Sequence, residues 1–226
     1  MQIVAIDTSG RHGSVALCRG GATSFEALGL AALEGGTYSA CLVPCIAELM
    51  QSAGVTKSQL DGFVAVDGPG SFTGLRVGLS TVKALGEVLG KPLATVSMLE
   101  ALALSYGQTD ETVTTVLDAG RGELYVGEYE IRGETAMSLH QSVQKQDGFL
   151  QKLPSQNSRV MTTFAKLAES PTAAAGGVTL VKALQAAAIA RIGLGKLLAG
   201  DTVDPATLDA NYIRRSDAEL FSLPRH

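Results

Sequence analysis

One short pattern occurs twice in this chain, and it constrains the fold more than any other feature of the sequence. An apolar stretch at 3–6 ends in Asp7 and a turn of small residues, and a second apolar stretch follows at 14–17. The same format returns at 114–117, Asp118 and 124–126. Repetition of one supersecondary unit predicts two similar lobes. We expect them at 1–106 and 107–226, with the second truncated and its last segment able to pack back on the first.

The order of apolar runs and turn residues predicts an α/β fold. Three short runs within residues 2–30, separated by turn residues, predict an antiparallel meander. Helical patterns at 37–53, 73–89 and 98–106 then alternate with strands at 63–66 and 93–96. Residues 132–178 carry only short signals, and a further helix is predicted at 180–198. Each lobe should therefore hold a mixed sheet with flanking helices.

The bulk composition excludes several classes of protein. With 18 Lys+Arg against 22 Asp+Glu, the formal charge of −4 gives no electrostatic footprint for direct nucleic-acid binding. No apolar run approaches the ~18 residues of a membrane span. Three cysteines without a secretion signal fit a reducing, cytoplasmic compartment. Since 46% of the residues are hydrophobic and only 18% are charged, we expect part of the surface to be covered by a partner.

The sequence supplies little for metal or nucleophilic catalysis. The three histidines lie far apart, without the paired spacing of a metal site, and nothing marks any of them as a general base. Cys41 and Cys45, four apart on the first helix, could share a metal ion. Two small buried residues of a core helix are the favoured interpretation. We expect no catalytic residue, metal or cofactor.

The glycine-rich turn at 68–74 joins a strand to a helix N-terminus, where an anion can bind. The same glycines could instead serve only a tight turn and close packing of the helix. Asp7 and Asp118 could position a magnesium ion near a nucleotide, or each could hydrogen-bond its own turn. The weak candidates for a nucleotide site are Asp7, Gly70, Ser71 and Asp118.

The helices at 37–53 and 73–89 are apolar over more than the ~100° of arc that covers one sheet face. Their second apolar side is covered either by the other lobe or by another molecule, and we favour an intermolecular interface. Small residues along the second helix would let another backbone come close. The expected interface residues are Tyr38, Cys41, Leu42, Cys45, Ile46, Leu49, Thr73, Gly74, Leu75, Arg76, Gly78, Leu79, Val82 and Lys83.

Four blocks of sequence resemble the bacterial TsaB (YeaZ) family, in the family's order and spacing. They are Val4–Ser9, GPGSFTGLRVG at 68–78, Leu117–Tyr125 and Tyr212-Ile213-Arg214. The resemblance is strong over 1–130 and thin over 132–200. It implies a shortened actin/sugar kinase/Hsp70-like (ASKHA) fold.

The resemblance also implies a function. Members of the family serve the synthesis of threonylcarbamoyladenosine beside the anticodon of tRNAs that read codons beginning with A. They do so as non-catalytic partners of a TsaD-like transferase, joined by a TsaE-like ATPase. They also form homodimers through the first and second helices. Contact with tRNA would then be only indirect, through the complex.

The TsaD-like paralogues carry a metal-binding HxxxH motif on the helix after the meander. The corresponding residues here, 36–41, contain no histidine, and Asp7-Thr8-Ser9 lacks the glycine that ATPases of the ASKHA superfamily have in their first phosphate turn. We therefore expect a scaffold that is not itself an enzyme. The alternative is a degenerate ASKHA phosphotransferase or ATPase that uses Asp7, Asp118 and the glycine-rich turn.

Overall fold

The computed structural model describes residues 1–153 and 158–208. The chain divides into two compact units. Unit 1 contains residues 1–101 together with 183–208 of the described chain, and unit 2 contains residues 102–182. The helix at Ala186–Ala199 thus belongs to unit 1, whereas the sequence pattern places it in the second lobe. The Tyr212–Arg214 block lies outside the described residues.

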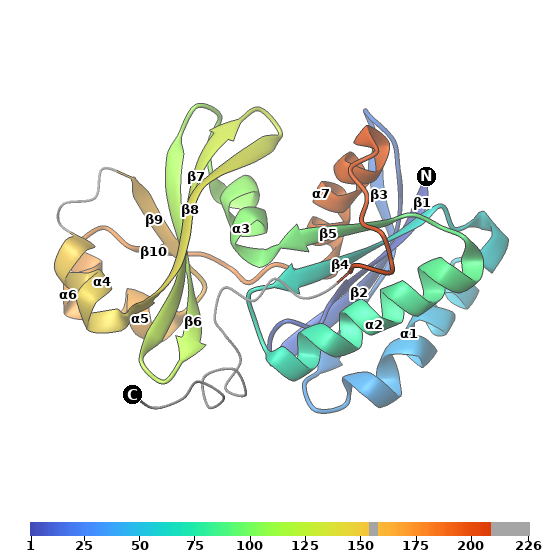
Figure 1. The fold of residues 1–226 in the computed structure, drawn as a ribbon, viewed down its shortest axis with the longest axis horizontal. Coiled ribbons are helices and arrows are strands. Elements are labelled where there is room, and N and C mark those ends of the chain that lie inside the picture. The colour runs from blue at the N-terminus through green and yellow to red at the C-terminus, as the bar shows by residue number, and fades with distance from the viewer. Residues whose placement is uncertain (154–157, 209–226) are drawn as a thin grey trace. The chain divides into compact units, whose positions relative to one another are not determined.

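The sheet of unit 1 has the strand order β3-β2-β1-β4-β5 (Figure 1). Its strands are β1 (Gln2–Asp7), β2 (His12–Gly20), β3 (Phe25–Glu34), β4 (Gly62–Gly68) and β5 (Leu93–Ser97). β1, β2 and β3 form the predicted antiparallel meander, and β4 and β5 run parallel to β1. β1, β2 and β4 are almost entirely buried, as expected for central strands covered on both faces.

Helices cover both faces of this sheet (Figure 1). α1 (Tyr38–Ser52) and α2 (Phe72–Leu89) lie side by side on one face, and α7 (Ala186–Ala199) lies on the other. A single-turn 3-10 helix, Lys57–Gln59, precedes β4. α7 approaches the sheet closely because Gly193 lies against Val64 and Gly62 lies against Leu197. It begins six residues later than its sequence pattern predicts.

Unit 2 repeats the sheet topology of unit 1, but its last two strands and its helices are shorter. Its sheet order is β10-β9-β6-β7-β8, so β6, β7 and β8 correspond to β1, β2 and β3. The strands are β6 (Thr112–Gly120), β7 (Glu123–Arg132), β8 (Thr135–Lys145), β9 (Arg159–Thr162) and β10 (Thr179–Leu180). β9 runs parallel to β6, as β4 does to β1. Two mixed five-stranded sheets with flanking helices confirm the predicted fold class.

Short helices complete unit 2. α3 (Met98–Tyr106) leads into it, and α4 (Gln146–Lys152), α5 (Ala165–Ala168) and α6 (Pro171–Ala175) accompany its sheet. Its core is an apolar cluster from the strands and the short helices. The fully buried members include Val116, Leu124, Val126, Phe149, Val160 and Leu167.

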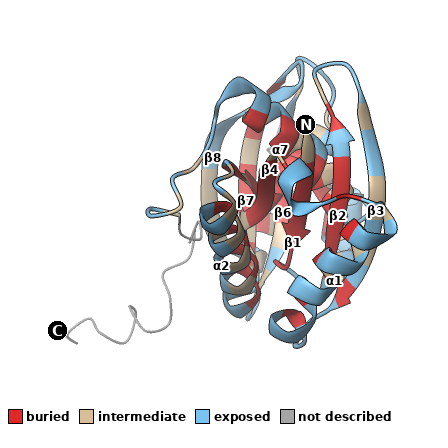
Figure 2. Ribbon diagram, turned by 90° about the vertical axis from the view of Figure 1, so that its right-hand side faces the viewer, coloured by how far each residue is buried: buried red, intermediate tan, exposed pale blue. Residues whose placement is uncertain are grey.

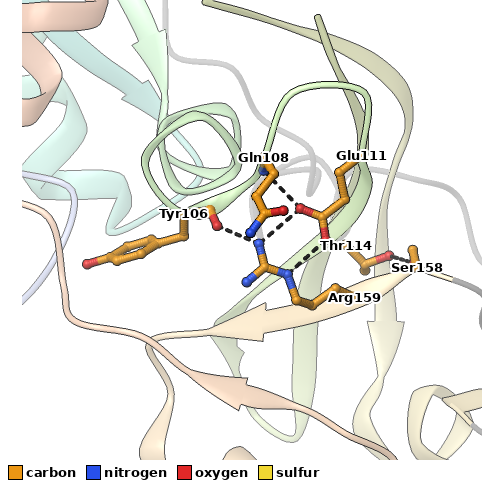
Figure 3. A network of polar contacts seen from close by, with 6 residues as sticks. All are labelled: Tyr106, Gln108, Glu111, Thr114, Ser158 and Arg159. Atoms are coloured by element: carbon orange, nitrogen blue, oxygen red, sulfur yellow. Dashed lines mark hydrogen bonds and ion pairs between the residues drawn. The ribbon is translucent and has the colours of Figure 1, made fainter. Parts of the chain in front are cut away.

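A polar network fixes the beginning of the unit 2 sheet (Figure 3). The Arg159 guanidinium donates to both carboxylate oxygens of Glu111, at 2.9 and 3.0 Å, and to the Tyr106 carbonyl at 2.5 Å. Glu111 also accepts from the Gln108 backbone N–H. Hydrogen bonds from Arg159 and Gln108 lower the pKa of Glu111. The start of β9 is thereby joined to the end of α3 and the segment before β6.

None of the helices in the described ranges combines the length and the apolar character needed to cross a bilayer.

Candidate partner-binding surface and the Asp7 turn

Asp7 ends β1 and is buried, with only 4% of its surface exposed. Its Oδ1 accepts from the Ser9 backbone N–H at 2.9 Å and from the Ser9 hydroxyl at 2.6 Å. Burial raises the pKa of Asp7, and the two hydrogen bonds from Ser9 oppose that rise. The carboxylate therefore braces its own turn, the structural alternative that its position at a strand end left open.

The glycine-rich turn packs directly on the Asp7 turn. Ser71 donates its backbone N–H to the Ser9 carbonyl at 2.6 Å, and the Thr8 hydroxyl donates to the Gly74 carbonyl at 2.8 Å. A Cβ atom at Gly70 would collide with Ser9, and one at Gly74 would collide with the Thr8 carbonyl. These glycines are thus explained by close backbone contact. The Ser71 hydroxyl caps α2 by accepting from the Gly74 N–H at 3.3 Å.

Asp118 is exposed at the corresponding place in unit 2. Its Oδ1 accepts from the Gly120 backbone N–H at 2.8 Å, which again is a turn formed by an Asp side chain. Asp7 and Asp118 belong to different units, and each is used locally. Within residues 1–153 and 158–208, no group of three or more His, Cys, Asp or Glu side chains is placed to hold a metal ion.

Many of the expected interface residues lie inside unit 1. As placed here they contact the chain's own sheet and do not reach the surface: Tyr38, Leu42, Ile46, Gly74, Leu75, Gly78, Leu79 and Val82. Tyr38 also donates its hydroxyl to the Gly10 carbonyl at 2.8 Å, which fastens the start of α1 to the Asp7 turn. Burial raises its pKa, with smaller contributions from the nearby Asp7 and Glu34 carboxylates.

The remaining expected residues do reach the surface. Cys41, Thr73 and Arg76 are exposed, and Cys45, Leu49 and Lys83 are partly exposed. Exposure of Cys41 corrects the expectation that both helical cysteines are buried core residues. Cys45 keeps a raised pKa, chiefly because it is partly desolvated and secondly because Glu48 and Cys41 lie near it.

Several outward-facing residues of these helices were missed by the sequence analysis. Val43 is 55% exposed on α1, and Phe72 and Val88 are 40% and 81% exposed on α2. The Arg76 guanidinium lies 3.8 Å from the centre of the Phe72 ring. We define the α1–α2 surface by the exposed residues of the two helices, which are Ser39, Ala40, Cys41, Val43, Pro44, Ala47, Glu48, Gln51, Ser52, Phe72, Thr73, Arg76, Ser80, Ala84, Glu87 and Val88.

The α1–α2 surface is suited to contact with another protein. Glu48 is the single charged residue of α1, and the exposed side chains around it are small or apolar. Small side chains let a partner helix approach closely, and the low charge of α1 is typical of the centre of a protein interface. Figure 2 shows the outward sides of both helices exposed and their sheet-facing sides buried. The signal in the sequence is the second apolar stripe of each helix.

Comparison with known proteins finds a matching family model and relatives that are named for tRNA modification. A family model described as TsaD, tRNA N6-adenosine threonylcarbamoyltransferase, matches residues 36–197. The tRNA threonylcarbamoyladenosine biosynthesis protein TsaB of Bacillus subtilis is 32% identical over 132 residues, which cover 58% of this chain and 56% of that protein. TsaB of Haemophilus influenzae is 32% identical over 127 residues, covering 55% and 52%. The chain thus matches about half the length of these curated relatives.

Solved structures share the fold over nearly the whole chain. A Pseudomonas aeruginosa protein with similarity to peptidase YEAZ superposes with a TM-score of 0.75 at 24% identity, covering 94% of this chain and 99% of that one. A second structure, YeaZ from Pseudomonas aeruginosa, gives a TM-score of 0.71 at 23% identity, covering 93% and 99%. At this identity, the likeness concerns the fold.

Proposed function

The chain belongs to the TsaB (YeaZ) family, and the related TsaD family model also matches it. We therefore propose that it is a non-catalytic subunit of the complex that synthesises threonylcarbamoyladenosine in tRNA. Its task is to bind and activate a TsaD-like transferase. That transferase modifies the adenosine beside the anticodon in tRNAs reading codons that begin with A. The observation that carries this proposal is the α1–α2 surface, whose solvent-exposed side chains are mostly small or apolar.

The geometry of the strand-end carboxylates supports a role without chemistry of its own. Asp7 accepts hydrogen bonds from Ser9, and Asp118 accepts one from the Gly120 backbone N–H. The space beside Gly70 is taken by Ser9, and the space beside Gly74 is taken by Thr8. α1 contains no histidine, so it lacks the metal-binding pair expected of the transferase itself. The alternative, a phosphotransferase, would need these same groups to face a nucleotide.

The same surface would also mediate self-association. A homodimer and a complex with the transferase would then be mutually exclusive, since both would bury the outward sides of α1 and α2. A TsaE-like ATPase would join the assembled complex, and tRNA would be reached through the transferase. The formal charge of −4 agrees with this indirect role.

The test places a charge on the α1–α2 surface without touching the core. Ala47→Glu on α1 and Ala84→Glu on α2 alter exposed residues, so the monomer should fold normally. Each should weaken co-purification with the cognate TsaD-like transferase, because a charge would be desolvated at the interface. Yield of modified tRNA in a reconstituted assay should fall in parallel.

Ala199→Glu serves as the matched control, since Ala199 is exposed at the end of α7, on the opposite face of the sheet. This variant should bind the transferase as the wild type does. Normal transferase binding by both Ala47→Glu and Ala84→Glu would disprove the assignment of this surface. Modified tRNA formed at full rate without the chain would disprove the function itself.

A further inference from the structure

One edge of the unit 1 sheet is partly paired, whereas the other is open within the described residues. At the β5 edge, Val203 forms an antiparallel bridge with Leu93 and donates its backbone N–H to the Leu93 carbonyl at 2.8 Å. At the β3 edge, no strand within the described ranges pairs with the outer side of β3. Figure 2 shows β3 at the margin of the sheet, with most of its length exposed or partly exposed. An open edge of this kind is a template for another strand.

The middle of β3 lacks lysine and proline, two of the usual protections of an edge strand. Residues 27–33 read Ala-Leu-Gly-Leu-Ala-Ala-Leu, with no charge and no proline. Such edges are normally blunted by lysine, proline, a short strand or a bulge. β3 carries one irregularity, at Leu28, which limits the regular template to Gly29–Glu34. Within it, Leu30 is 41% exposed and Ala32 is exposed.

The edge strand of unit 2 offers a weaker template. The second half of β8 is polar, with Gln141, Ser142 and Gln144 along it. Its irregularity falls in the middle of the strand, between Ser138 and His140. β10, at the other edge of that sheet, has only two residues. β8 matches β3 in length and in the extent of its regular register, so β3 differs from it by the apolar, uncharged sequence of residues 29–33 in its regular half.

Charge at the two ends of the uncharged stretch specifies what would bind. Glu26 precedes it and Glu34 ends it, and both side chains are exposed. The Glu34 carboxylate lies 3.3 Å from Nδ1 of His12, and each of these side chains is 74% exposed. Opposite charges facing each other across neighbouring strands stabilise the pairing. A strand with basic residues at its ends would meet an acid at both ends of β3.

We propose that β3 accepts an additional strand from a partner protein, namely an extended, uncharged segment flanked by Lys or Arg. Main-chain hydrogen bonds along Gly29–Glu34 would give the affinity, and the two acidic ends would give orientation and selectivity. This site lies on a strand, apart from the outward sides of α1 and α2, so it stands whether or not the proposed function is correct.

A second copy of the chain fits this edge less well. Antiparallel pairing of two β3 strands brings the Glu34 end of one copy against the Glu26 end of the other. Like charges facing each other across paired strands are destabilising, and this contact would occur twice. The two acidic ends therefore act against self-pairing while they favour a basic strand.

The experiment uses the full chain, isotopically labelled, and a capped peptide of sequence Lys-Thr-Val-Thr-Val-Thr-Lys. At about pH 8 we expect shift changes and slowed amide exchange confined to residues 25–34. The same peptide with glutamate at both ends should bind about tenfold more weakly. The double variant Glu26→Lys/Glu34→Lys should reverse this preference.

Glu87→Lys is the matched control, because Glu87 is exposed on α2, away from the β3 edge. It should leave peptide binding unchanged. Three outcomes would overturn the proposal: no protection of β3 at several times saturating peptide concentrations, equal binding of the two peptides, or protection located elsewhere. Protection of β3 that depends on protein concentration without peptide would identify a second copy as the occupant, and would also overturn it.

Discussion

At the scale of single residues, glycine decides how α2 meets β1. Gly74 and Gly78 lie on the side of α2 that faces the Asp7 turn. A Cβ atom at Gly74 would collide with the Thr8 carbonyl, and one at Gly78 would collide with the Thr8 hydroxyl. The absence of a side chain at both positions allows the Thr8 hydroxyl to bond the Gly74 carbonyl. The glycines thus mark the inward side of the helix, and a partner would have to bind the opposite side.

Gly78→Ala should destabilise unit 1 by about 1–3 kcal/mol, because a methyl group has no room beside Thr8 and the helix would have to shift. Gly195→Ala is the matched control, since Gly195 is also within a helix but has nothing near its Cβ position. That change should stabilise the fold by about 0.5–1 kcal/mol through helix propensity. Denaturant unfolding measures both. Equal effects of the two substitutions would contradict the close contact.

Asp67 is a second residue whose surroundings have a measurable consequence. It lies near the end of β4, and its Oδ1 is buried without a hydrogen-bond partner. Burial raises the pKa of Asp67, while the Thr95 hydroxyl and the Lys196 cation lower it and Glu100 raises it further. Since the pKa in the folded state lies above the ordinary value of about 3.9, ionisation of Asp67 opposes folding.

Asp67→Asn should therefore stabilise the protein at neutral pH. In the wild type, stability due to this carboxyl is greatest at acid pH, where it is protonated in both states. That stability is lost as the pH rises from the ordinary pKa through the raised folded value. The gain from asparagine should accordingly shrink toward zero on acidification. Unfolding curves over a pH series check this, and a constant difference between variant and wild type would refute the role of Asp67 ionisation.

At the scale of elements, the sequence predicts well wherever period and turn chemistry agree. The helices predicted at 37–53 and 73–89 begin and end within one residue of α1 and α2. α7 is different, because the predicted helix starts at residue 180, whereas β10 and the following connection take residues 179–185. Pairing of β10 with β9 there overrides helix propensity.

Sequence patterns could not decide which apolar side of α1 and α2 faces the sheet. Both helices are apolar on two sides, so periodicity alone fits either orientation. The expected interface consequently mixes inward residues such as Leu42 and Leu79 with outward ones such as Cys41. The polar network of unit 2 was also not foreseen, because its partners are 48 residues apart in the chain.

That network gives a prediction about unit 2. Arg159→Ala should destabilise it by about 1 kcal/mol, because the partly exposed ion pair with Glu111 and the bond to the Tyr106 carbonyl are both lost. Since the pKa of Glu111 is lowered, the contribution of the pair is present above its ordinary value and is lost as the pH falls through the folded value.

Arg132→Ala is the matched control, since Arg132 pairs with Glu130 only two residues away on the surface of β7. Its cost should be close to zero. Amide exchange along β6 and β9 is the appropriate measurement, because it reports unit 2 separately from unit 1. Equal exchange in both variants would show that the Arg159 network does not stabilise this sheet.

At the scale of the whole molecule, one topology has been used twice and developed unequally. The strand orders β3-β2-β1-β4-β5 and β8-β7-β6-β9-β10 are equivalent, but β9 and β10 have four and two residues against seven and five in β4 and β5. Unit 1 carries long helices on its sheet, whereas α4, α5 and α6 are short. The duplication was visible in the sequence because both copies keep the strand–Asp–turn format.

The strand-end turns of the two units bear on the choice between a scaffold and an enzyme. A phosphotransferase of this fold class would use the strand-end turns of both units around one nucleotide. Here Asp7 and Asp118 each close a local turn. Neighbouring backbone atoms take the space beside Gly70 and Gly74. We therefore expect the isolated chain to show no ATP turnover, measured by phosphate release with Mg-ATP.

The decisive variant is Asp7→Asn, in which the amide oxygen can still accept from Ser9 and keep the turn. As a scaffold, this variant should bind the TsaD-like transferase and support tRNA modification at the wild-type level, because no proton or metal is handled by Asp7. Asp7→Ala, which removes the acceptor, should instead lose stability by about 1–3 kcal/mol through the unsatisfied Ser9 groups. If the wild type bound nucleotide tightly and turned it over, and Asp7→Asn abolished that turnover, the protein would be an enzyme and the scaffold proposal would be wrong.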